Sequence, residues 1–272
     1  MNAIKLSAPA TKEFWEIPVL FEDEHLLALD KPADVLTSPD RYDLERPNLM
    51  RLLHDGIAAQ KPWATHRQLS YLSNAHRLDF ETSGVLLLAK SKMALVALAN
   101  LFGTDQPELR YFALIAGEPS SDRFEMNAKI APNVASLGLM RIDPVNGKKA
   151  KTHFEVVEKF SGYTALHGRP VTGRTHQVRV HLKHAGFPLL GDKLYGGKPL
   201  WLSRLKQDFR LKPGREERAL ISRCALHLEQ LTLPHPITST PVTITSPLPK
   251  DLRVALRYLR EFRGSGTAAS QA

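Results

Sequence analysis

Strand-like segments that follow one another without regular crossover helices restrict the fold most. Residues 19–32 have the pattern of a strand, an acidic turn and a second strand, and residues 85–91 (VLLLAKS) have the pattern of a buried strand. Further strand patterns cover residues 110–118 and 151–160. Parallel strands need a crossover connection, usually a helix, and most of these segments lack one. The sequence therefore predicts an α+β fold with a mixed or antiparallel sheet and helices packed on it.

Amphipathic segments predict the helices. Residues 48–60 and 91–102 carry apolar side chains at helical spacing behind the candidate N-caps Asn48 and Ser91. Two further helices are expected later in the chain, over residues 173–186 and 251–262.

A single domain is expected over most of the chain. Residues 1–13 and 264–272 have the composition of flexible ends, and residues 14–263 are predicted to form one domain. No apolar run approaches the roughly 20 residues that span a bilayer, and the N-terminus does not resemble a secretory signal. Cys224 is the only cysteine, which excludes an intrachain disulfide and a cysteine-based zinc site. A cytoplasmic protein without a membrane partner is expected.

The chain is strongly basic. Its formal net charge is +9, which is typical of proteins with an anionic partner such as nucleic acid, although a basic soluble enzyme also fits. Residues 198–223 contain eight Lys and Arg against three Asp and Glu, with Trp201 and Phe209 among them. This segment is either an RNA-facing excursion or a solvated helix and loop whose aromatic side chains pack inward.

Three short segments contain candidate catalytic residues. Asp79 lies in AHRLDFETSGVLLLAKS, at the entrance to an apolar strand, although an isolated loop Asp is usually a turn former. Arg179 lies beside the apolar stripe of the expected helix over residues 173–186, where a buried Arg would require a carboxylate partner. Tyr111 lies in the strand segment ELRYFALIAG, where a core or edge aromatic is the simpler interpretation. His176, His181 and His184 lack the spacing of a zincin helix, so no metal site is expected.

Taken together, these motifs point to a known family. HRLD-x-x-TSG, RYFALIAG, TGRTHQVRVHL-x-x-x-G-x-PLLGD-x-x-YGG and RCALHLEQLTLPHP occur in this order, after the early segment DEHLLALDKP. In this combination the chain closely resembles the RluA-like family of pseudouridine synthases, over residues 17–249. The resemblance implies an α+β catalytic fold with a long, mostly antiparallel sheet, flanking helices and a central RNA-binding cleft.

The resemblance also implies site residues and a substrate. Asp79 corresponds to the catalytic Asp, Tyr111 to the active-site aromatic and Arg179 to the paired Arg. RNA contacts are expected from His76 and Arg77 of the HRLD motif and from Arg174 and His176 of the TGRTHQ motif. Arg77 is expected to help displace the target nucleotide from its stack. The expected substrate is ribosomal or transfer RNA, the enzyme is expected to be a monomer, and neither a metal nor another cofactor is expected.

The chemistry explains why the family needs these groups. Pseudouridine formation breaks the bond from ribose to the base nitrogen and rejoins the base through carbon, without net redox change. A carboxylate either attacks the sugar carbon or removes a ribose proton, and the sequence leaves both routes open. A neighbouring cation favours an ionised carboxylate, so Arg179 is expected to keep Asp79 reactive. Tyr111 is expected to hold the uracil ring by stacking, which is worth about 1–3 kcal/mol per base.

Three features depart from many relatives. Leu109 stands where many of them carry a Lys two residues before the active-site Tyr, and Arg110 lies next to Tyr111 instead. Many relatives have a small RNA-binding domain before the catalytic one, and such a domain is not expected here. Residues 198–223 form an unusually long connection between the YGG and RCALH motifs. Two rival functions stay open: a non-catalytic RNA-binding protein or chaperone, and a metal-dependent phosphoesterase that uses His76, Asp79 and the histidines near Arg179.

Overall fold

The chain forms two compact units. The computed structural model describes residues 3–9, 11–40 and 46–264. Unit 1 comprises Met1–Leu109 and Leu228–Pro247, and unit 2 comprises Arg110–His227 and Leu248–Ala272. The sequence predicted one domain over residues 14–263, whereas the structure divides this stretch between two units. The expected C-terminal tail lies outside the described residues except for Gly264.

Unit 1 is built on a sheet with the strand order β1-β2-β3-β5-β12. These strands are β1 (Ala3–Ala8), β2 (Glu13–Glu22), β3 (Leu26–Lys31), β5 (Ser83–Ala89) and β12 (Leu226–Pro234). β4 (Ser73–Asn74) pairs with β5, and β13 (Pro241–Thr245) pairs with β12. The pairs β1–β2, β2–β3, β3–β5 and β12–β13 are all antiparallel. The expected strand, acidic turn and strand over residues 19–32 are therefore confirmed.

The N-terminal segment differs from its prediction. Residues 1–13 were expected to be flexible, yet Ala3–Ala8 forms β1 and pairs with β2. Ile4, Leu6 and Ala8 are buried, because this short segment alternates between apolar and exposed side chains.

Three helices accompany the sheet of unit 1. They are α1 (Leu49–Ala58), α2 (Pro62–Thr65) and α3 (Lys92–Gly103). Asn48 and Ser91 cap α1 and α3 as predicted, since the Asn48 side chain accepts a hydrogen bond from the Arg51 backbone N–H and that of Ser91 accepts one from Ala94. Leu49 and Leu53 of α1 join the core formed by β1, β3 and β5.

Unit 2 has a second antiparallel arrangement, with the strand order β6-β11-β10-β7. Its strands are β6 (Glu108–Ala116), whose first two residues belong to unit 1, β7 (Arg123–Asn127), β10 (Lys151–Phe160) and β11 (Tyr163–Pro170). A separate pair consists of β8 (Ile130–Pro132) and β9 (Met140–Ile142). The helical elements are α4 (Gln177–His184), η1 (Lys193–Tyr195), α5 (Leu202–Leu205) and α6 (Lys250–Arg263).

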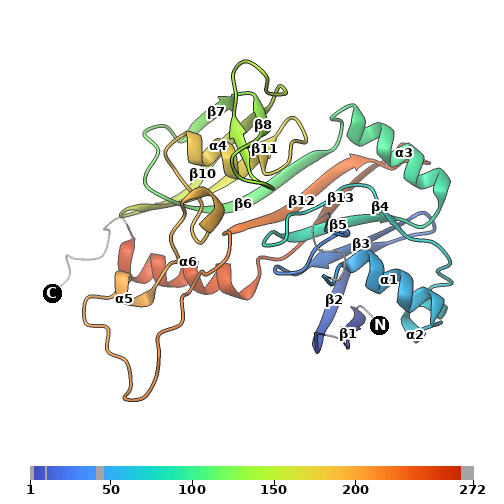
Figure 1. The fold of residues 1–272 in the computed structure, drawn as a ribbon, viewed down its shortest axis with the longest axis horizontal. Helices are drawn as coiled ribbons and strands as arrows, with labels where there is room; N and C mark the ends of the chain where they lie inside the picture. The colour runs from blue at the N-terminus through green and yellow to red at the C-terminus, as the bar shows by residue number, and fades with distance from the viewer. Residues whose placement is uncertain (1–2, 10, 41–45, 265–272) are drawn as a thin grey trace. The chain divides into compact units, whose positions relative to one another are not determined.

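Helices cover both faces of the unit 2 strands. Ala113 and Ile115 of β6 pack in one cluster with Val178 of α4. The alternate residues Phe112 and Leu114 pack in another cluster with residues of α5 and α6. Because successive side chains of a strand point to opposite faces, α4 lies on one face and α5 with α6 on the other, as Figure 1 shows.

The structure confirms the α+β class with mostly antiparallel strands and flanking helices. The helix expected over residues 173–186 is shorter, Gln177–His184, because the preceding residue His176 adopts a left-handed backbone conformation with φ 53°. Within the described residues, the model contains no helix with the length and hydropathy needed to cross a membrane.

Candidate active site

Asp79 lies in a loop that precedes β5 and is held on both sides. Its carbonyl accepts a hydrogen bond from the backbone N–H of Thr82, 3.1 Å away. The neighbouring Leu78 is bonded through both backbone groups to the Thr37 hydroxyl, at 3.0 and 3.2 Å. On the other side, the Phe80 carbonyl accepts from the backbone N–H of Asp34, at 2.9 Å. The loop backbone on either side of Asp79 is therefore fixed.

Gly84 explains the small-residue turn that follows Asp79. Its φ is +119°, and a Cβ atom built there would lie 2.2 Å from the Leu228 carbonyl oxygen. Only glycine combines this backbone conformation with so close an approach. The Gly of the Thr-Ser-Gly motif therefore lets β12 pack directly against the start of β5.

Lys31 stabilises the backbone of the Asp79 loop through hydrogen bonds. Its side chain is fully buried, and Nζ donates hydrogen bonds to the carbonyls of Pro32, Phe80 and Thr82 at 2.9, 3.3 and 2.8 Å. A Lys is rarely buried so completely unless its ammonium is satisfied. Lys31 was not identified from the sequence, although a Lys at the end of a largely apolar strand was a usable signal.

Replacing Lys31 with methionine should loosen this loop. The substitution leaves the three carbonyls without this donor, and we expect it to lower the free energy of unfolding by about 1–3 kcal/mol. Urea denaturation monitored by circular dichroism measures the loss, with the exposed Lys61→Met variant as control. Equal stability of the two variants would contradict a supporting role for Lys31.

His76 is held inside unit 1. Its Nε2 accepts a hydrogen bond from the backbone N–H of Leu87 at 3.0 Å, and its ring stacks on Phe102 with centroids 5.1 Å apart. Burial lowers the pKa of His76 to about 4. Because Nε2 accepts, the neutral ring carries its proton on Nδ1, which has no hydrogen-bond partner among the described residues. These contacts fasten the loop to β5 and α3, while the expected RNA contact of His76 stays a prediction.

The low pKa of His76 makes stability depend on pH. Its pKa in the unfolded chain is near 6.5, so the unfolded state binds more protons between about pH 6.5 and 4. The free energy of unfolding should therefore fall as pH falls through this window, by about 1–3 kcal/mol. Urea midpoints at several pH values measure the slope, and His76→Gln, which keeps an acceptor for Leu87, should flatten it. An unchanged slope in this variant would assign the effect to other groups.

Arg77 has a different environment from its neighbours. Its side chain is exposed, whereas Leu78 is buried. Beside the same loop, the Arg46 guanidinium lies 4.0 Å from the centroid of the Phe80 ring. Two guanidinium groups therefore lie near the Asp79 loop, one of which the sequence analysis did not identify.

Arg179 forms a buried ion pair in unit 2. Its Nε and Nη2 donate to the two carboxylate oxygens of Asp192, at 2.8 and 2.7 Å. The side chains of Arg179 and Asp192 are only 2% and 0% exposed. The guanidinium carbon also lies 5.1 Å from the centroid of the Tyr195 ring. The predicted burial of Arg179 is thus confirmed, and Asp192 is a carboxylate partner that the sequence analysis missed, although it belongs to the quoted PLLGD motif.

His176 and Arg174 lie just before α4. The Tyr195 hydroxyl accepts a hydrogen bond from the Met140 backbone N–H at 3.0 Å and shares a second hydrogen bond with Nδ1 of His176, 2.7 Å away. Arg174 is half-buried, and its Nε donates to the Lys149 carbonyl at 3.0 Å. Both residues are thus positioned by unit 2 itself, and their contacts with RNA stay predictions.

The histidines of α4 have separate surroundings. His181 is fully buried between the Thr152 hydroxyl, 2.9 Å from Nδ1, and the Ala128 carbonyl, 3.0 Å from Nε2. His184, in contrast, is exposed. In the described part of the chain, no three His, Cys, Asp or Glu side chains are grouped so that they could hold a metal ion.

Tyr111 lies on the face of β6 that packs against α4. It is half-buried and packs against the cluster that contains Ala113, Ile115 and Val178. Tyr111 and the helix that carries Arg179 thus share one face of unit 2. Asp79 belongs to unit 1, so its approach to these two residues is part of the function proposed below.

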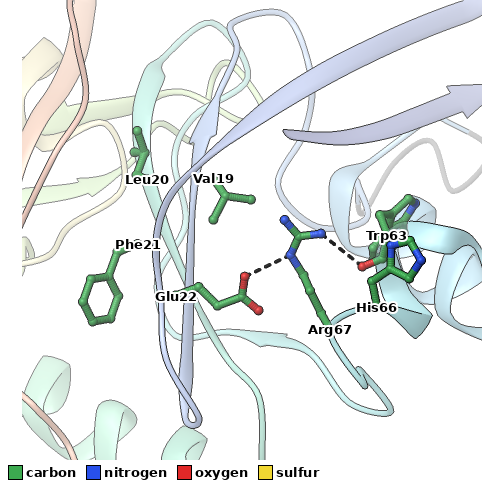
Figure 2. A pocket seen from close by; sticks show the side chains of 7 residues that line it. All are labelled: Val19, Leu20, Phe21, Glu22, Trp63, His66 and Arg67. Carbon is green, nitrogen blue, oxygen red and sulfur yellow. Dashed lines mark hydrogen bonds and ion pairs between the residues drawn. The ribbon is translucent and has the colours of Figure 1, made fainter. Parts of the chain in front are cut away.

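A pocket of about 490 Å³ lies at another part of unit 1. Figure 2 shows its lining, where the Glu22 carboxylate accepts from Arg67 Nε at 2.9 Å. Lys90, just after the end of β5, also donates to Glu22 at 3.1 Å. Since Asp79 precedes the start of β5, the pocket lies at the opposite end of this strand, and its charges are largely balanced by one another.

Comparison with known proteins identifies the family. The family model described as RNA pseudouridylate synthase matches residues 25–184, which is more than half of the chain. This chain belongs to the RNA pseudouridylate synthase family. The predicted RluA-like resemblance is confirmed, and the chain is an RNA pseudouridine synthase. The matched part contains Asp79, Tyr111 and Arg179, but ends before Asp192.

Relatives within this family include bacterial ribosomal enzymes. Ribosomal large subunit pseudouridine synthase D of Xylella fastidiosa is 34% identical over 252 residues, covering 90% of this chain and 70% of the relative. Ribosomal large subunit pseudouridine synthase C of Escherichia coli is 32% identical over 247 residues, with 90% and 70% covered. The solved structure of human RNA pseudouridylate synthase domain containing 4 has the same fold, with a TM-score of 0.67 and 23% identity, covering 89% of this chain and 92% of that one.

Proposed function

We propose that this pseudouridine synthase isomerises uridine in large-subunit ribosomal RNA, with Asp79 as the reacting carboxylate. The observation that carries the proposal is the similarity, over about nine-tenths of the chain, to enzymes that are named for the ribosomal large subunit. Since ribosomal RNA is the proposed substrate, we place the enzyme in the cytoplasm. Transfer RNA, the other substrate class expected from the sequence, becomes an arm of the test below.

The Asp79 loop suits this role. A carboxylate that reacts at a sugar carbon must be held in place, because small displacements cost large factors in rate. The backbone of Leu78 is bonded to the Thr37 hydroxyl and the Phe80 carbonyl to the Asp34 N–H, while the buried Lys31 side chain donates to the carbonyls of Phe80 and Thr82. In the proposed reaction, Asp79 either attacks the sugar carbon or removes the adjacent ribose proton, and the bond to the base nitrogen breaks.

The residues of unit 2 supply the rest of the proposed site. Arg179 uses Nε and Nη2 to bind Asp192, so its guanidinium has one fixed orientation. We propose that in the reaction its positive charge favours the ionised form of the Asp79 carboxylate. Tyr111 then stacks against the uracil ring while the base rotates and rejoins the sugar through carbon.

The basic residues of the HRLD and TGRTHQ motifs suit RNA capture. Flipping a uridine from its stack costs a few kcal/mol, which phosphate contacts offset. We propose that Arg77 fills the vacated space and that Arg174 and His176 contact the RNA backbone. His76 contributes mainly by holding the loop, since its ring is already bonded to Leu87 and stacked on Phe102.

Tritium release tests the proposal. The purified enzyme is incubated with transcripts of large-subunit ribosomal RNA and of transfer RNA, each labelled with tritium at uracil carbon five, in the presence of EDTA. We expect release from the ribosomal transcript, because the proton on this carbon leaves when the base rejoins the sugar. Release from transfer RNA alone would reassign the substrate. Binding without release from any cellular RNA would instead favour a non-catalytic RNA-binding protein.

A further inference from the structure

Unit 2 carries a row of exposed cations on the face of its strands away from α4. Lys250, Arg253 and Arg257 of α6 are exposed and follow one another at intervals of three and four residues, so they lie on one side of the helix. The opposite side of α6, which includes Leu252, Ala255, Leu256 and Leu259, is buried in the unit 2 core.

The loop after α5 adds further cations beside this helix. Lys206, Arg210, Lys212 and Arg215 are all exposed. At the start of the loop, Lys206 Nζ lies 5.8 Å from the ring centroid of Phe262 on α6. At its end, the Glu217 carboxylate accepts from the backbone N–H of Ser203 on α5, at 2.8 Å. Both ends are therefore tied next to α6, and Figure 1 shows the loop projecting from this side of unit 2.

The charges on these two elements are not neutralised locally. We call the following seven cations the basic surface: Lys206, Arg210, Lys212, Arg215, Lys250, Arg253 and Arg257. Among the described residues, none of the seven takes part in an ion pair. Other cations nearby do, since Arg223 binds Asp251 at 2.7 Å and Arg260 binds Glu158 at 2.8 Å. The basic surface thus consists of exposed cations whose charge no acidic side chain of the described residues neutralises in an ion pair.

We infer that the basic surface binds the sugar-phosphate backbone of the substrate RNA, away from the reacting uridine. This inference rests on the proposed function and deepens it. Exposed Lys and Arg without protein partners are matched by the regular negative charges of a nucleic acid. An anionic membrane surface is the less suitable occupant, because the apolar side of α6 is already buried and unavailable for insertion.

The position of the basic surface has a consequence for the size of the substrate. Arg179 and Tyr111 belong to the α4 face of the unit 2 strands, whereas α5 and α6 cover the other face. RNA that is bound at both places must therefore extend around unit 2. A minimal stem-loop around the target uridine contacts only the α4 face, whereas a long transcript contacts both the α4 face and the basic surface.

Two double variants and their combination test the inference. The loop variant is Arg210→Gln/Lys212→Gln, and the helix variant is Arg253→Gln/Arg257→Gln. For a large-subunit ribosomal RNA transcript at 0.15 M salt, we expect each double variant to raise KM several-fold and the combination to raise it about tenfold, with kcat unchanged. The combination should reduce the slope of log affinity against log salt by about 3, since each lost phosphate contact removes about 0.7–0.9. The KM for a minimal stem-loop should not change.

A matched variant distinguishes an effect of these particular positions on RNA affinity from an effect of the protein's net charge. It removes four exposed cations elsewhere on the chain, through Lys5→Gln, Lys61→Gln, Lys92→Gln and Lys129→Gln. An equal loss of affinity in this variant would overturn the inference, since net charge alone would explain the effect. Wild-type affinity and salt slope in the combined variant would also overturn it.

Filter binding to the same transcript tests RNA binding by the basic surface separately from the proposed catalytic function. It measures the basic surface directly, so the surface is tested even if no RNA releases tritium. Vesicles of phosphatidylglycerol and phosphatidylcholine provide a further arm. If the combined variant loses vesicle binding but keeps RNA affinity, the surface serves a membrane and the inference is wrong.

Discussion

Replacing Asp79 with asparagine should abolish tritium release while leaving the affinity for RNA within a few-fold of wild type. The amide can neither attack the sugar carbon nor accept a ribose proton, so both routes to bond cleavage are closed. The fold should survive, because the hydrogen bonds that hold the loop come from backbone groups and from Thr37 and Lys31. Release under single-turnover conditions measures the chemistry, and filter binding measures the affinity.

The matched control for this substitution is Asp55→Asn, because Asp55 is an exposed residue of α1. It makes the same chemical change on a helix of the same unit and should keep wild-type activity. Substantial release by Asp79→Asn would mean that another carboxylate reacts. A loss of RNA affinity in parallel with activity would instead make Asp79 a binding residue.

Removing Arg179 should have the largest effect on stability. In Arg179→Ala, the buried Asp192 carboxylate loses its cationic partner and two hydrogen bonds, and removing one partner of a buried ion pair typically costs about 3–5 kcal/mol. Urea denaturation measures this loss. Tritium release, measured below the unfolding transition, should fall as well, because the proposed partner of Asp79 is missing.

A double substitution separates the two effects. Arg179→Met/Asp192→Leu replaces the buried pair with apolar side chains of similar size, a change that is often neutral or stabilising. We expect it to recover most of the lost stability without recovering activity. Recovery of both would show that Arg179 acts only by pairing with Asp192. A stable Arg179→Ala variant would show that the Asp192 carboxylate tolerates the loss of its partner, contrary to its burial.

Local patterns predicted much of the fold. The caps Asn48 and Ser91 and the apolar run of residues 85–91 depend on neighbours in sequence, and all lie where they were expected. The N-terminal strand was missed because Ala3–Ala8 is short and becomes a strand through pairing with β2. The expected helix over residues 173–186 begins only after His176 because this residue has a left-handed backbone conformation, which side-chain periodicity does not report.

The candidate site was predictable in its residues but not in its supports. Asp79, Tyr111 and Arg179 were identified as candidates because they lie in distinctive motifs. Lys31 and Asp192 were not, since their importance comes from contacts with residues distant in sequence, such as Thr82. A buried charged residue needs a partner of opposite charge, but the sequence does not show which residue provides it.

The division into two units was equally invisible in the sequence. Unit 1 is interrupted by residues 110–227 and resumes at Leu228. The chain crosses between the units within β6, within β12 and between Pro247 and Leu248. The first two crossings lie inside strands and lack the Gly-rich or Pro-rich composition that marks many linkers, and only the third has prolines, Pro247 and Pro249, beside it.

This interruption has a consequence for how the enzyme is made. Gly84, just after the Asp79 loop, packs against the Leu228 backbone, His235 bonds to Asp23 at 3.1 Å, and Ser246 bonds to Asp30 at 2.7 Å. The first and larger part of unit 1, Met1–Leu109, leaves the ribosome long before these partners are synthesised, and such distant pairings form slowly. The Asp79 loop therefore acquires its complete surroundings only near the end of translation, so an incompletely translated chain carries the proposed catalytic carboxylate in an unfinished sheet.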